Sequence, residues 1–520
     1  SNLLGMKRLF LSFCIGLACC SLSAQSTVTY SNPVIPGDVA DPTIIRAGDV
    51  YYAAGTSSEW APFYPLFKSY DLVNWRQIGH LFEEQPAWTK SSFWAPELFY
   101  YRGTYYVYYT ARRKSDGVSY IGVATSDIPS GPYTDHGVVV EYGTEAIDAF
   151  ILEDEGQLYI SWKAYGLDDR PIELLGCKLS ADGLRLEGEP FSLLKDEERL
   201  GMEGQHWLKL GDYYYLIYSV NGCCGPKSDY AVSVARSKSL QGPYEKYEGN
   251  PILHGGDEIQ SCGHGTVTTT PDGRMYYLCH AYFPGEDFFM GRQPILQELV
   301  LGDDAWLHFK EGETASTEHP LPLAGHVQQS LPDFYDDFTS DRLRVEWTWN
   351  YPFATPHIQL FGGRLSLSGE PKADAGAGTA LCLRPVAADY TFETVLLNQN
   401  EARKGITMYG DDRNLLSITC RNNQLELSLR KDGKETSLAA PVILPIPERG
   451  EMPVYLRLQV KAGCQYAFFY SLNGKDWTQI KQQVQNADLV QWDRVARPGL
   501  YYEGKTGEAL FEYALMRNQQ

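Results

Sequence analysis

Basic residues are scarce in this chain relative to acidic ones. Its 520 residues include 45 lysines and arginines against 65 aspartates and glutamates, a net charge of −20. The negative electrostatic potential of such a chain repels phosphate backbones, so nucleic acid is not an expected partner. Charged residues make up 21% and hydrophobic residues 43%, a balance that excludes disordered and collagenous chains. No apolar run beyond residue 24 could cross a bilayer, so we expect no transmembrane segment in the mature chain.

Paired cysteine motifs are also missing. The eight cysteines beyond residue 24 are scattered and form neither a paired C-x-x-C zinc pattern nor a dense disulfide framework. Among these eight, only Cys223 and Cys224 are adjacent, within a loop sequence that also holds Gly222, Gly225 and Pro226. A vicinal disulfide that shapes this loop and two thiols in a turn are equally compatible with the sequence.

The N-terminal segment, residues 1–24, has the pattern of a secretory signal peptide. A basic start at Met6-Lys7-Arg8 is followed by an apolar run from Leu9 to Cys20 and by small residues that end at Ala24. We therefore expect an exported protein, periplasmic or extracellular, or on the surface of a bacterium. Lipoprotein anchoring through Cys19 or Cys20 is the minor alternative, because neither has the small-residue frame of a lipobox.

Aromatic residues are abundant, at 13% of the chain, and they fall into a repeat. Each repeat has a short apolar strand, a glycine or polar turn and a tyrosine-rich second strand. Successive repeats begin at nearly constant intervals along the chain. The five starts are Asp41, Ala95, Asp148, Glu203 and His264. Three or four strands per unit, five times over, predict an all-β protein with a five-bladed β-propeller over residues 25–320.

A propeller brings the first strand of every blade to the central channel. Asp41, Asp148, Glu203 and His264 would therefore meet in one funnel, which is costly unless these groups are used or paired. Carboxylate pairs across a pocket are the usual equipment for glycoside hydrolysis. Beyond the repeat, residues 330–520 show alternating strands and turn signals that predict a β-sandwich of jelly-roll or concanavalin-like type. Residues 311–332 are interpreted as the linker.

Several short motifs, taken together and in order, resemble glycoside hydrolase family 43. They are Ala40-Asp41-Pro42, Trp94-Ala95-Pro96-Glu97, Ile147-Asp148-Ala149-Phe150, Glu203-Gly204-Gln205-His206, Gly263-His264-Gly265-Thr266 and Gly291-Arg292-Gln293-Pro294. The sequence departs from the family pattern at Ala149 and Gln205, where proline is frequent. Neither change removes a chemical group. The C-terminal region resembles the sandwich appended to some β-xylosidases and arabinofuranosidases of that family, which either closes one side of the active-site mouth or only stabilises or binds carbohydrate.

The resemblance implies roles for individual residues. Asp41 matches the general base that activates water, Glu203 the general acid, and Asp148 the third carboxylate, which orients the acid and raises its pKa. The implied sugar-binding residues are Trp94, Phe150 and Arg292. His264 matches the axial histidine near which many members hold a hydrated calcium, an ion that the chemistry itself does not require.

The implied activity is an exo-acting, inverting hydrolysis that releases arabinose or xylose from oligo- or polysaccharides. An exo-β-1,3-galactosidase and a non-catalytic carbohydrate-binding propeller are the alternatives. A retaining β-fructosidase also joins a five-bladed propeller to a sandwich, but its Asn-Asp-Pro-Asn motif is replaced here by Ala40-Asp41-Pro42-Thr43. The sequence leaves the sugar, the oligomeric state and the role of the sandwich open.

Overall fold

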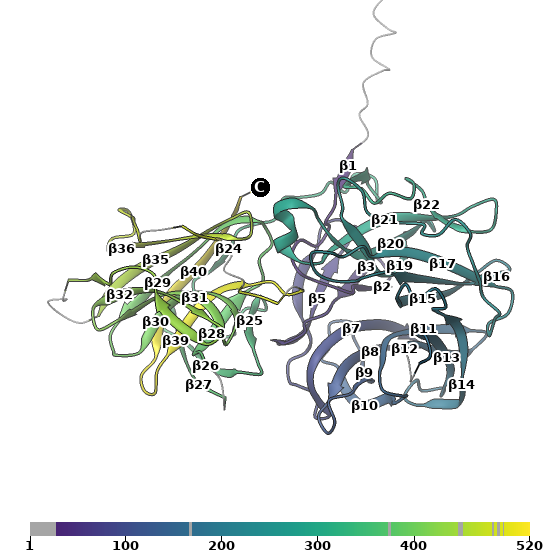
Figure 1. Ribbon diagram of the computed structural model, residues 1–520, viewed down its shortest axis with the longest axis horizontal. Helices are drawn as coiled ribbons and strands as arrows, with labels where there is room; N and C mark the ends of the chain where they lie inside the picture. Colours follow the sequence, from purple (N-terminus) through teal and green to yellow (C-terminus); the bar gives the residue numbers. More distant parts are fainter. Residues whose placement is uncertain are drawn as a thin grey trace, which may run out of the picture.

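A computed structural model describes residues 28–165, 169–372, 376–445, 451–480, 483–485, 489–491 and 493–519. The predicted signal peptide lies outside the described residues. The chain forms a propeller and a sandwich side by side, drawn at the right and left of Figure 1. No helix in the described part of the chain is both long and apolar enough to span a membrane.

The propeller has five four-stranded antiparallel sheets, so the predicted fold class is confirmed. The first strand of each blade lies innermost and the next three follow outward in chain order. The first three blades are β2 (Thr43–Ala47), β3 (Val50–Ala54), β5 (Phe63–Ser69) and β6 (Arg76–Phe82); β7 (Thr89–Tyr101), β8 (Thr104–Arg113), β9 (Ser119–Ser126) and β10 (Thr134–Val140); and β11 (Ala146–Asp154), β12 (Gln157–Ala164), β13 (Glu173–Leu179) and β14 (Leu186–Lys195). The last two are β15 (Met202–Leu210), β16 (Tyr213–Val220), β17 (Ala231–Ser237) and β18 (Glu245–Lys246); and β19 (Ser261–Thr269), β20 (Met275–Tyr282), β21 (Gln293–Leu301) and β22 (Leu307–Phe309), with the 3-10 helix η1 (Gly285–Met290) between β20 and β21.

Hydrophobic clusters join neighbouring blades and close the ring. The cluster between the first and last blades combines Tyr51 and Phe67 with Leu278 and Leu296. Four further clusters join the remaining neighbours in the same way. Burying these strands is the dominant favourable contribution to folding, and it explains why tyrosine and branched residues recur in each repeat.

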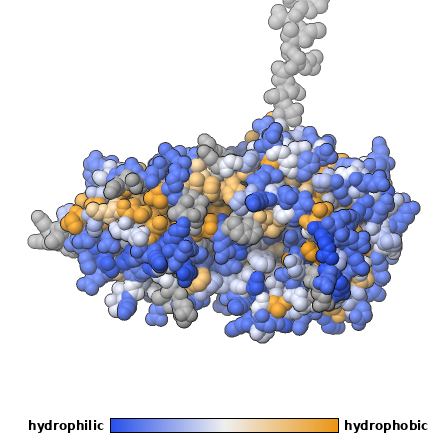
Figure 2. Space-filling view, in the orientation of Figure 1, coloured by the Kyte–Doolittle hydropathy of each residue, from blue (hydrophilic) through white to orange (hydrophobic). Residues whose placement is uncertain are grey.

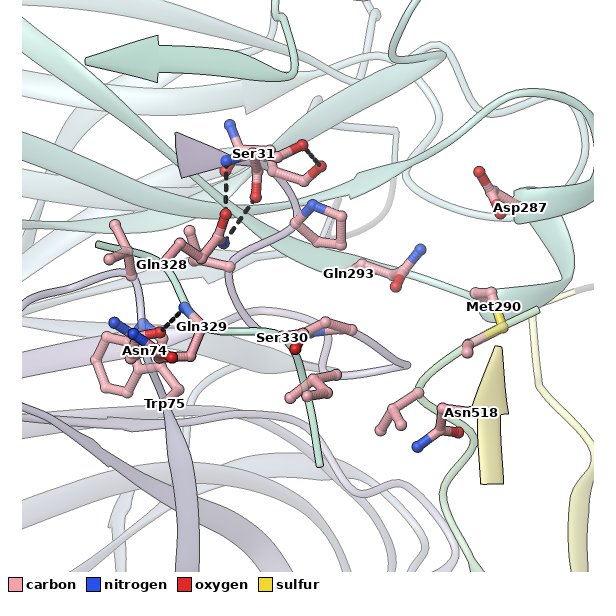
Figure 3. Close-up of a pocket in the computed structure, with 18 of the residues that line it drawn as sticks. Ser31, Asn74, Trp75, Asp287, Met290, Gln293, Gln328, Gln329, Ser330 and Asn518 are labelled. Atoms are coloured by element: carbon pink, nitrogen blue, oxygen red, sulfur yellow. Dashed lines mark hydrogen bonds between the residues drawn. The ribbon is translucent and has the colours of Figure 1, made fainter. Parts of the chain in front are cut away.

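The predicted linker is partly an element of the propeller. Within residues 311–332, strand β23 (Glu318–Pro320) pairs with β1 (Thr29–Ser31) near the start of the described chain. The Gln328 side chain then exchanges hydrogen bonds with the backbone of Ser31, and the backbone N–H of Gln329 donates to Asn74 Oδ1 (Figure 3). The linker is therefore fastened along the propeller before the sandwich begins.

Two nine-stranded sheets enclose one core in the C-terminal region, so the predicted sandwich is confirmed. One sheet follows the order β26-β27-β40-β29-β35-β36-β37, and the other follows β33-β32-β31-β30-β39-β28-β25-β4. The strands of the first sheet are β24 (Phe334–Asp336), β26 (Ala354–Phe361), β27 (Arg364–Pro371), β29 (Asp389–Asn398), β35 (Met452–Lys461), β36 (Gln465–Ser471), β37 (Thr478–Gln479), β38 (Val484–Gln485) and β40 (Ala509–Gln519). Those of the second are β4 (Trp60–Ala61), β25 (Trp347–Asn350), β28 (Thr379–Leu383), β30 (Arg403–Asp411), β31 (Asn414–Arg421), β32 (Gln424–Lys431), β33 (Lys434–Ser437), β34 (Val442–Ile443) and β39 (Arg497–Glu503).

One sandwich sheet extends into the propeller. Strand β4 leaves the first blade and pairs with β25, so that Ala61 lies opposite Trp349. Arg384 of the sandwich donates to the carbonyl of Pro36 at 2.6 Å, and the Arg497 guanidinium lies 4.3 Å from the Trp60 ring. The two domains therefore share backbone pairing as well as side-chain contacts. On the face shown in Figure 2, polar residues cover most of the propeller, and hydrophobic residues gather over the sandwich.

The buried histidine His206 predicts a pH dependence of stability. Burial lowers its pKa to about 3, and its Nδ1 accepts a hydrogen bond from the Val267 amide, so the folded state holds the ring neutral. The unfolded chain binds a proton there once the pH falls below 6.5, so stability decreases from that pH toward 3. Between pH 7 and pH 4 the wild type should lose about 3 kcal/mol of unfolding free energy through His206, and His206→Gln should not show that loss. Urea unfolding at both pH values measures this.

The exposed His357 provides the matched control for that measurement. His357→Gln should leave the wild-type pH dependence in place. An unchanged pH dependence in His206→Gln would show that His206 accepts its proton in the folded state.

Candidate active site

The five blades share one unusual backbone feature beside the central channel, within the inner strand or, in the first blade, just before it. One residue per blade adopts a left-handed conformation: Asp41 (φ 53°), Ala95 (φ 41°), Asp148 (φ 61°), Gly204 (φ 61°) and His264 (φ 52°). In the last four blades this residue lies at a register shift between the first and second strands. Positive φ is costly for residues other than glycine, and such strain clusters where a site requires it.

This feature corrects the predicted phase of the fourth repeat. The residue equivalent to Asp41, Asp148 and His264 is Gly204, one position after Glu203. Glu203 lies in register with Ser219, and it is equivalent instead to Trp94, the residue before the left-handed Ala95. Both Glu203 and Trp94 are half-buried, whereas Asp148 is only 5% exposed. Glu203 therefore lies one residue before the left-handed position that Asp41 and Asp148 occupy, and it is more exposed than Asp148.

The left-handed residues are held by side chains of the preceding blade. Backbone N–H groups donate from Ala95 to Thr56 Oγ1 (2.9 Å), from Asp148 to Thr110 Oγ1 (3.2 Å), from His264 to Ser219 Oγ (2.8 Å) and from Asp41 to His280 Nδ1 (2.9 Å). The acceptors occupy equivalent positions, because each follows the left-handed residue of its own blade at nearly the same spacing along the chain. Sequence reasoning missed all four, although this constant spacing was available.

Lys163 occupies the same position in the third blade and breaks the pattern. A lysine ammonium has no acceptor. The Gly204 amide donates instead to Asp148 Oδ2 at 3.0 Å, which draws that carboxylate toward the fourth blade. Burial would lower the pKa of Lys163, but Glu203, Asp148 and Glu145 outweigh it and raise that pKa. A buried cation thus faces two of the predicted catalytic carboxylates.

Asp41 is held as an anion. Its Oδ2 accepts a 2.6 Å hydrogen bond from Thr56, and its Oδ1 lies 3.1 Å from His264 Nδ1 and 3.9 Å from Arg292 Nη1. Burial would raise the pKa of Asp41, but His264 and Arg292 outweigh it and hold that pKa well below its ordinary value. His280 stays neutral because burial and Arg292 lower its pKa, so its Nδ1 can accept the Asp41 N–H.

Asp148 and His264 are shifted in the opposite direction. Burial raises the pKa of Asp148. The neighbouring Glu203 raises it further, whereas His264 acts in the opposite direction. Burial would lower the pKa of His264, but Asp41 and Asp148 raise it to about 9. At neutral pH an imidazolium therefore lies between two carboxyl groups, 3.1 Å from Asp41 and 3.9 Å from Asp148.

The predicted sugar-binding residues have different surroundings. Arg292 reaches Asp41 and is 8% exposed, with its Nε buried and without a hydrogen-bond partner among the described residues. Trp94 is half-buried, and the Arg112 guanidinium lies 5.9 Å from its ring. Phe150 packs in the core between two blades, with its ring 4.1 Å from the His206 ring. The structure brings Arg292 to the Asp41 carboxylate and places Phe150 in a packing environment.

The residues near His264 do not form a calcium site of their own. Calcium takes six to eight oxygen ligands. Among the described residues, no group of three or more His, Cys, Asp or Glu side chains is arranged to hold a metal ion. Water would have to supply the ligands, so calcium at the axis stays a prediction, and no chemical step is derived from it.

The sandwich contacts residues beside the candidate site. Arg494 Nε lies 3.2 Å from Glu59 Oε2 of the first blade. Asp493 and Arg494 also line, together with Thr56 and Arg292, a small cavity of about 10 Å³. A far larger cavity of about 1110 Å³ lies elsewhere, between the linker, the first blade and the sandwich, and none of the three carboxylates lines it (Figure 3). The sandwich therefore packs against the Asp41 side of the candidate site.

Comparisons with known proteins match both domains. The model of glycosyl hydrolases family 43 matches residues 30–307, and the β-xylosidase C-terminal concanavalin A-like domain matches residues 335–504. A xylan 1,3-β-xylosidase of Vibrio sp. is 28% identical over 89% of this chain and 92% of its own. A non-reducing end α-L-arabinofuranosidase of Bacteroides ovatus is 29% identical over 82% of both chains.

Solved structures show the same two-domain fold. The family 43 protein BlXynB of Bacillus licheniformis has a TM-score of 0.81 at 24% identity and covers 94% of this chain and 100% of its own. A xylan β-1,4-xylosidase of Bacillus halodurans has the same TM-score, identity and coverage. At this identity the likeness is evidence for the fold alone.

Proposed function

Because the chain belongs to glycosyl hydrolases family 43, whose members hydrolyse glycosidic bonds with inversion, we propose that it removes terminal β-xylosyl or α-L-arabinofuranosyl residues from oligo- or polysaccharides. The observation that carries this proposal is the convergence of Asp41, Asp148 and Glu203 at the propeller axis, around His264 and Arg292. The named relatives, xylosidases and arabinofuranosidases, support the choice of sugars.

Asp41 is suited to the base of an inverting reaction. Thr56 and His264 fix its two carboxylate oxygens, and its depressed pKa keeps it ionised at neutral pH. An ionised, oriented carboxylate can take a proton from a water molecule as that water attacks the anomeric carbon. The Arg292 guanidinium, whose buried Nε has no hydrogen-bond partner among the described residues, is the group that we assign to a hydroxyl of the bound sugar.

Glu203 is suited to the acid on the opposite side. Its carboxyl group forms no hydrogen bond with the described residues and is half-buried, so it is available to the leaving-group oxygen. Asp148 orients it indirectly: the Asp148 carboxylate accepts the N–H of Gly204, and Gln205 donates to the Asp148 carbonyl at 2.6 Å. Both bonds fix the backbone that carries Glu203.

The choice of sugar is tested on nitrophenyl glycosides. We expect the β-D-xyloside or the α-L-arabinofuranoside to be hydrolysed with a kcat/KM about tenfold to 200-fold above that of the β-D-galactoside, because a small pocket discriminates by about that factor against one extra carbon group. Proton NMR of the first product should show the inverted anomer. Preferential cleavage of the galactoside would support the exo-β-1,3-galactosidase instead, and a retained anomer would contradict the assigned mechanism.

We also propose that the chain is exported by the signal pattern of residues 1–24, with a periplasmic or surface location. The basic start and short apolar run support this. Fractionation of cells that express the full chain, with sequencing of the mature N-terminus, tests it: a chain that keeps residues 1–24 and stays in the cytoplasm would overturn the proposal.

A further inference from the structure

Adjacent cysteines lie on a loop that borders the candidate site. Cys223 and Cys224 form a disulfide in the loop that joins β16 to β17. That loop follows directly after Ser219, which holds the His264 backbone. Both cysteines are only half-buried, so a small reductant can reach them.

The loop is pinned on both sides of the disulfide by other groups. The Asp229 carboxylate accepts the Gly222 N–H at 2.8 Å, and Ser228 Oγ donates to the Gly222 carbonyl at 3.0 Å. The Gly225 N–H donates to Tyr282 Oη at 3.0 Å. Because none of these bonds involves Cys223 or Cys224, opening the disulfide should change its two sulfur atoms and leave the loop in place.

One sulfur atom contacts the arginine of the site. Arg292 Nη1 lies 3.4 Å from Cys224 Sγ and 3.9 Å from Asp41 Oδ1. Its backbone N–H donates to Asp38 Oδ1 at 2.9 Å, which fixes the base of the side chain. The guanidinium is thus held between the predicted catalytic base and the disulfide, and its Nε has no hydrogen-bond partner in the described part of the chain.

The redox state of the two sulfur atoms changes the chemical group that Arg292 contacts. A disulfide sulfur is a neutral, weak acceptor that cannot ionise. A thiol beside a guanidinium tends to ionise, because the cation lowers its pKa. A thiolate at Cys224 would attract Arg292 away from Asp41 and from the bound sugar. Opening the disulfide takes two electrons and two protons from a dithiol reductant, which is itself oxidised to a disulfide, and leaves two cysteine thiols.

We propose that the Cys223–Cys224 disulfide is a redox-sensitive positioning element that holds Arg292 in its sugar-binding orientation. The oxidised enzyme is the form with high affinity for its sugar. Reduction weakens substrate binding, whereas Thr56 and His264 still hold Asp41 oriented and ionised, and Glu203 keeps its role. The proposal rests on the proposed function, since the bound sugar is the substrate of that same site.

The test compares the full-length enzyme before and after treatment with dithiothreitol. We expect KM for the preferred nitrophenyl glycoside to rise about threefold to tenfold on reduction, the range that loss of one hydrogen bond spans, with kcat nearly unchanged. Alkylation with iodoacetamide followed by peptide mass analysis should find both thiols of residues 223–224 only after reduction. The variant Cys223→Ala/Cys224→Ala, which can form neither the disulfide nor a thiolate, should show no response of KM to the reductant.

Cys177→Ala is the matched control, because Cys177 is buried in the third blade and lies outside any disulfide; this variant should respond to dithiothreitol as the wild type does. Alkylated Cys223 and Cys224 without reductant, or equal KM values in both states, would overturn the proposal. Absence of hydrolysis by the oxidised enzyme on every glycoside would instead contradict the proposed function. In that case, calorimetric binding of xylose and arabinose in both redox states replaces KM, and equal affinities would overturn the proposal.

Discussion

Glu203→Gln is expected to lower kcat on xylobiose or an arabinofuranosyl oligosaccharide by about 10²- to 10⁴-fold, the usual contribution of a positioned proton donor. The loss should be much smaller on a 2,4-dinitrophenyl glycoside of the same sugar, since that leaving group departs without a proton. Glutamine keeps the size and hydrogen-bonding ability of the side chain, so the fold should persist. Steady-state kinetics on the two substrates measure the difference.

Asp41→Asn and Glu145→Gln serve as comparisons for that result. Asp41→Asn should lose activity on both substrates, because activation of water is needed whatever the leaving group. Glu145 is a nearby half-buried carboxyl whose charge also acts on Lys163, and Glu145→Gln should leave kcat nearly unchanged. If Glu203→Gln lost activity equally on both glycosides, Glu203 would not be the acid.

Gly204→Ala is expected to lower both stability and turnover. A Cβ on Gly204 would lie 2.7 Å from Cγ and 3.0 Å from the backbone Cα of His264, and the residue has φ +61°. The left-handed backbone costs alanine about 1–2 kcal/mol, and the forced contact adds about 1–3 kcal/mol. Because His264 lies between Asp41 and Asp148, its displacement should also reduce kcat at least about tenfold, or about 1.4 kcal/mol in activation free energy.

Gly211 offers a matched control in the same blade. It has nearly the same φ, +59°, but a Cβ there would meet no described atom within 4 Å. Gly211→Ala should therefore show only the backbone cost and keep wild-type kcat. Thermal unfolding and kinetics of the two variants separate strain from contact. Equal effects in both variants would show that the contact between the new Cβ and His264 contributes to neither the loss of stability nor the loss of activity.

The blades and the candidate carboxylates were predictable because their signals are local. Strand alternation, glycine turns and paired tyrosines recur at a nearly constant interval, and Asp41, Asp148 and His264 occupy equivalent places in that repeat. The sequence pattern places the fourth blade one residue out of phase, because the acidic Glu203 resembles the aspartates that begin two other repeats. Only the backbone shows that Gly204 adopts the left-handed conformation there.

The partners of these residues were harder to predict from local pattern. Thr110, Ser219 and His280 are ordinary strand residues, Thr56 lies two positions after strand β3, and each acts on a residue of the following blade. Their constant spacing is visible once the ring is known, but hydroxyl residues in strands are too common to single out. The linker strand β23 was missed because its partner β1 lies before the first blade, at the far end of the propeller sequence.

By itself the sequence determined the all-β class, the five repeats, the second β-rich domain and three of the acidic groups that converge, since these depend on composition and on periodicities within one repeat. The tertiary structure alone decided which charges meet. It sets His264 between Asp41 and Asp148, places Lys163 where the other blades have an acceptor, and brings Arg292 against Cys224 and Asp41. Those contacts shift the pKa values, because Coulomb interactions in a buried channel depend on distances that ring closure fixes.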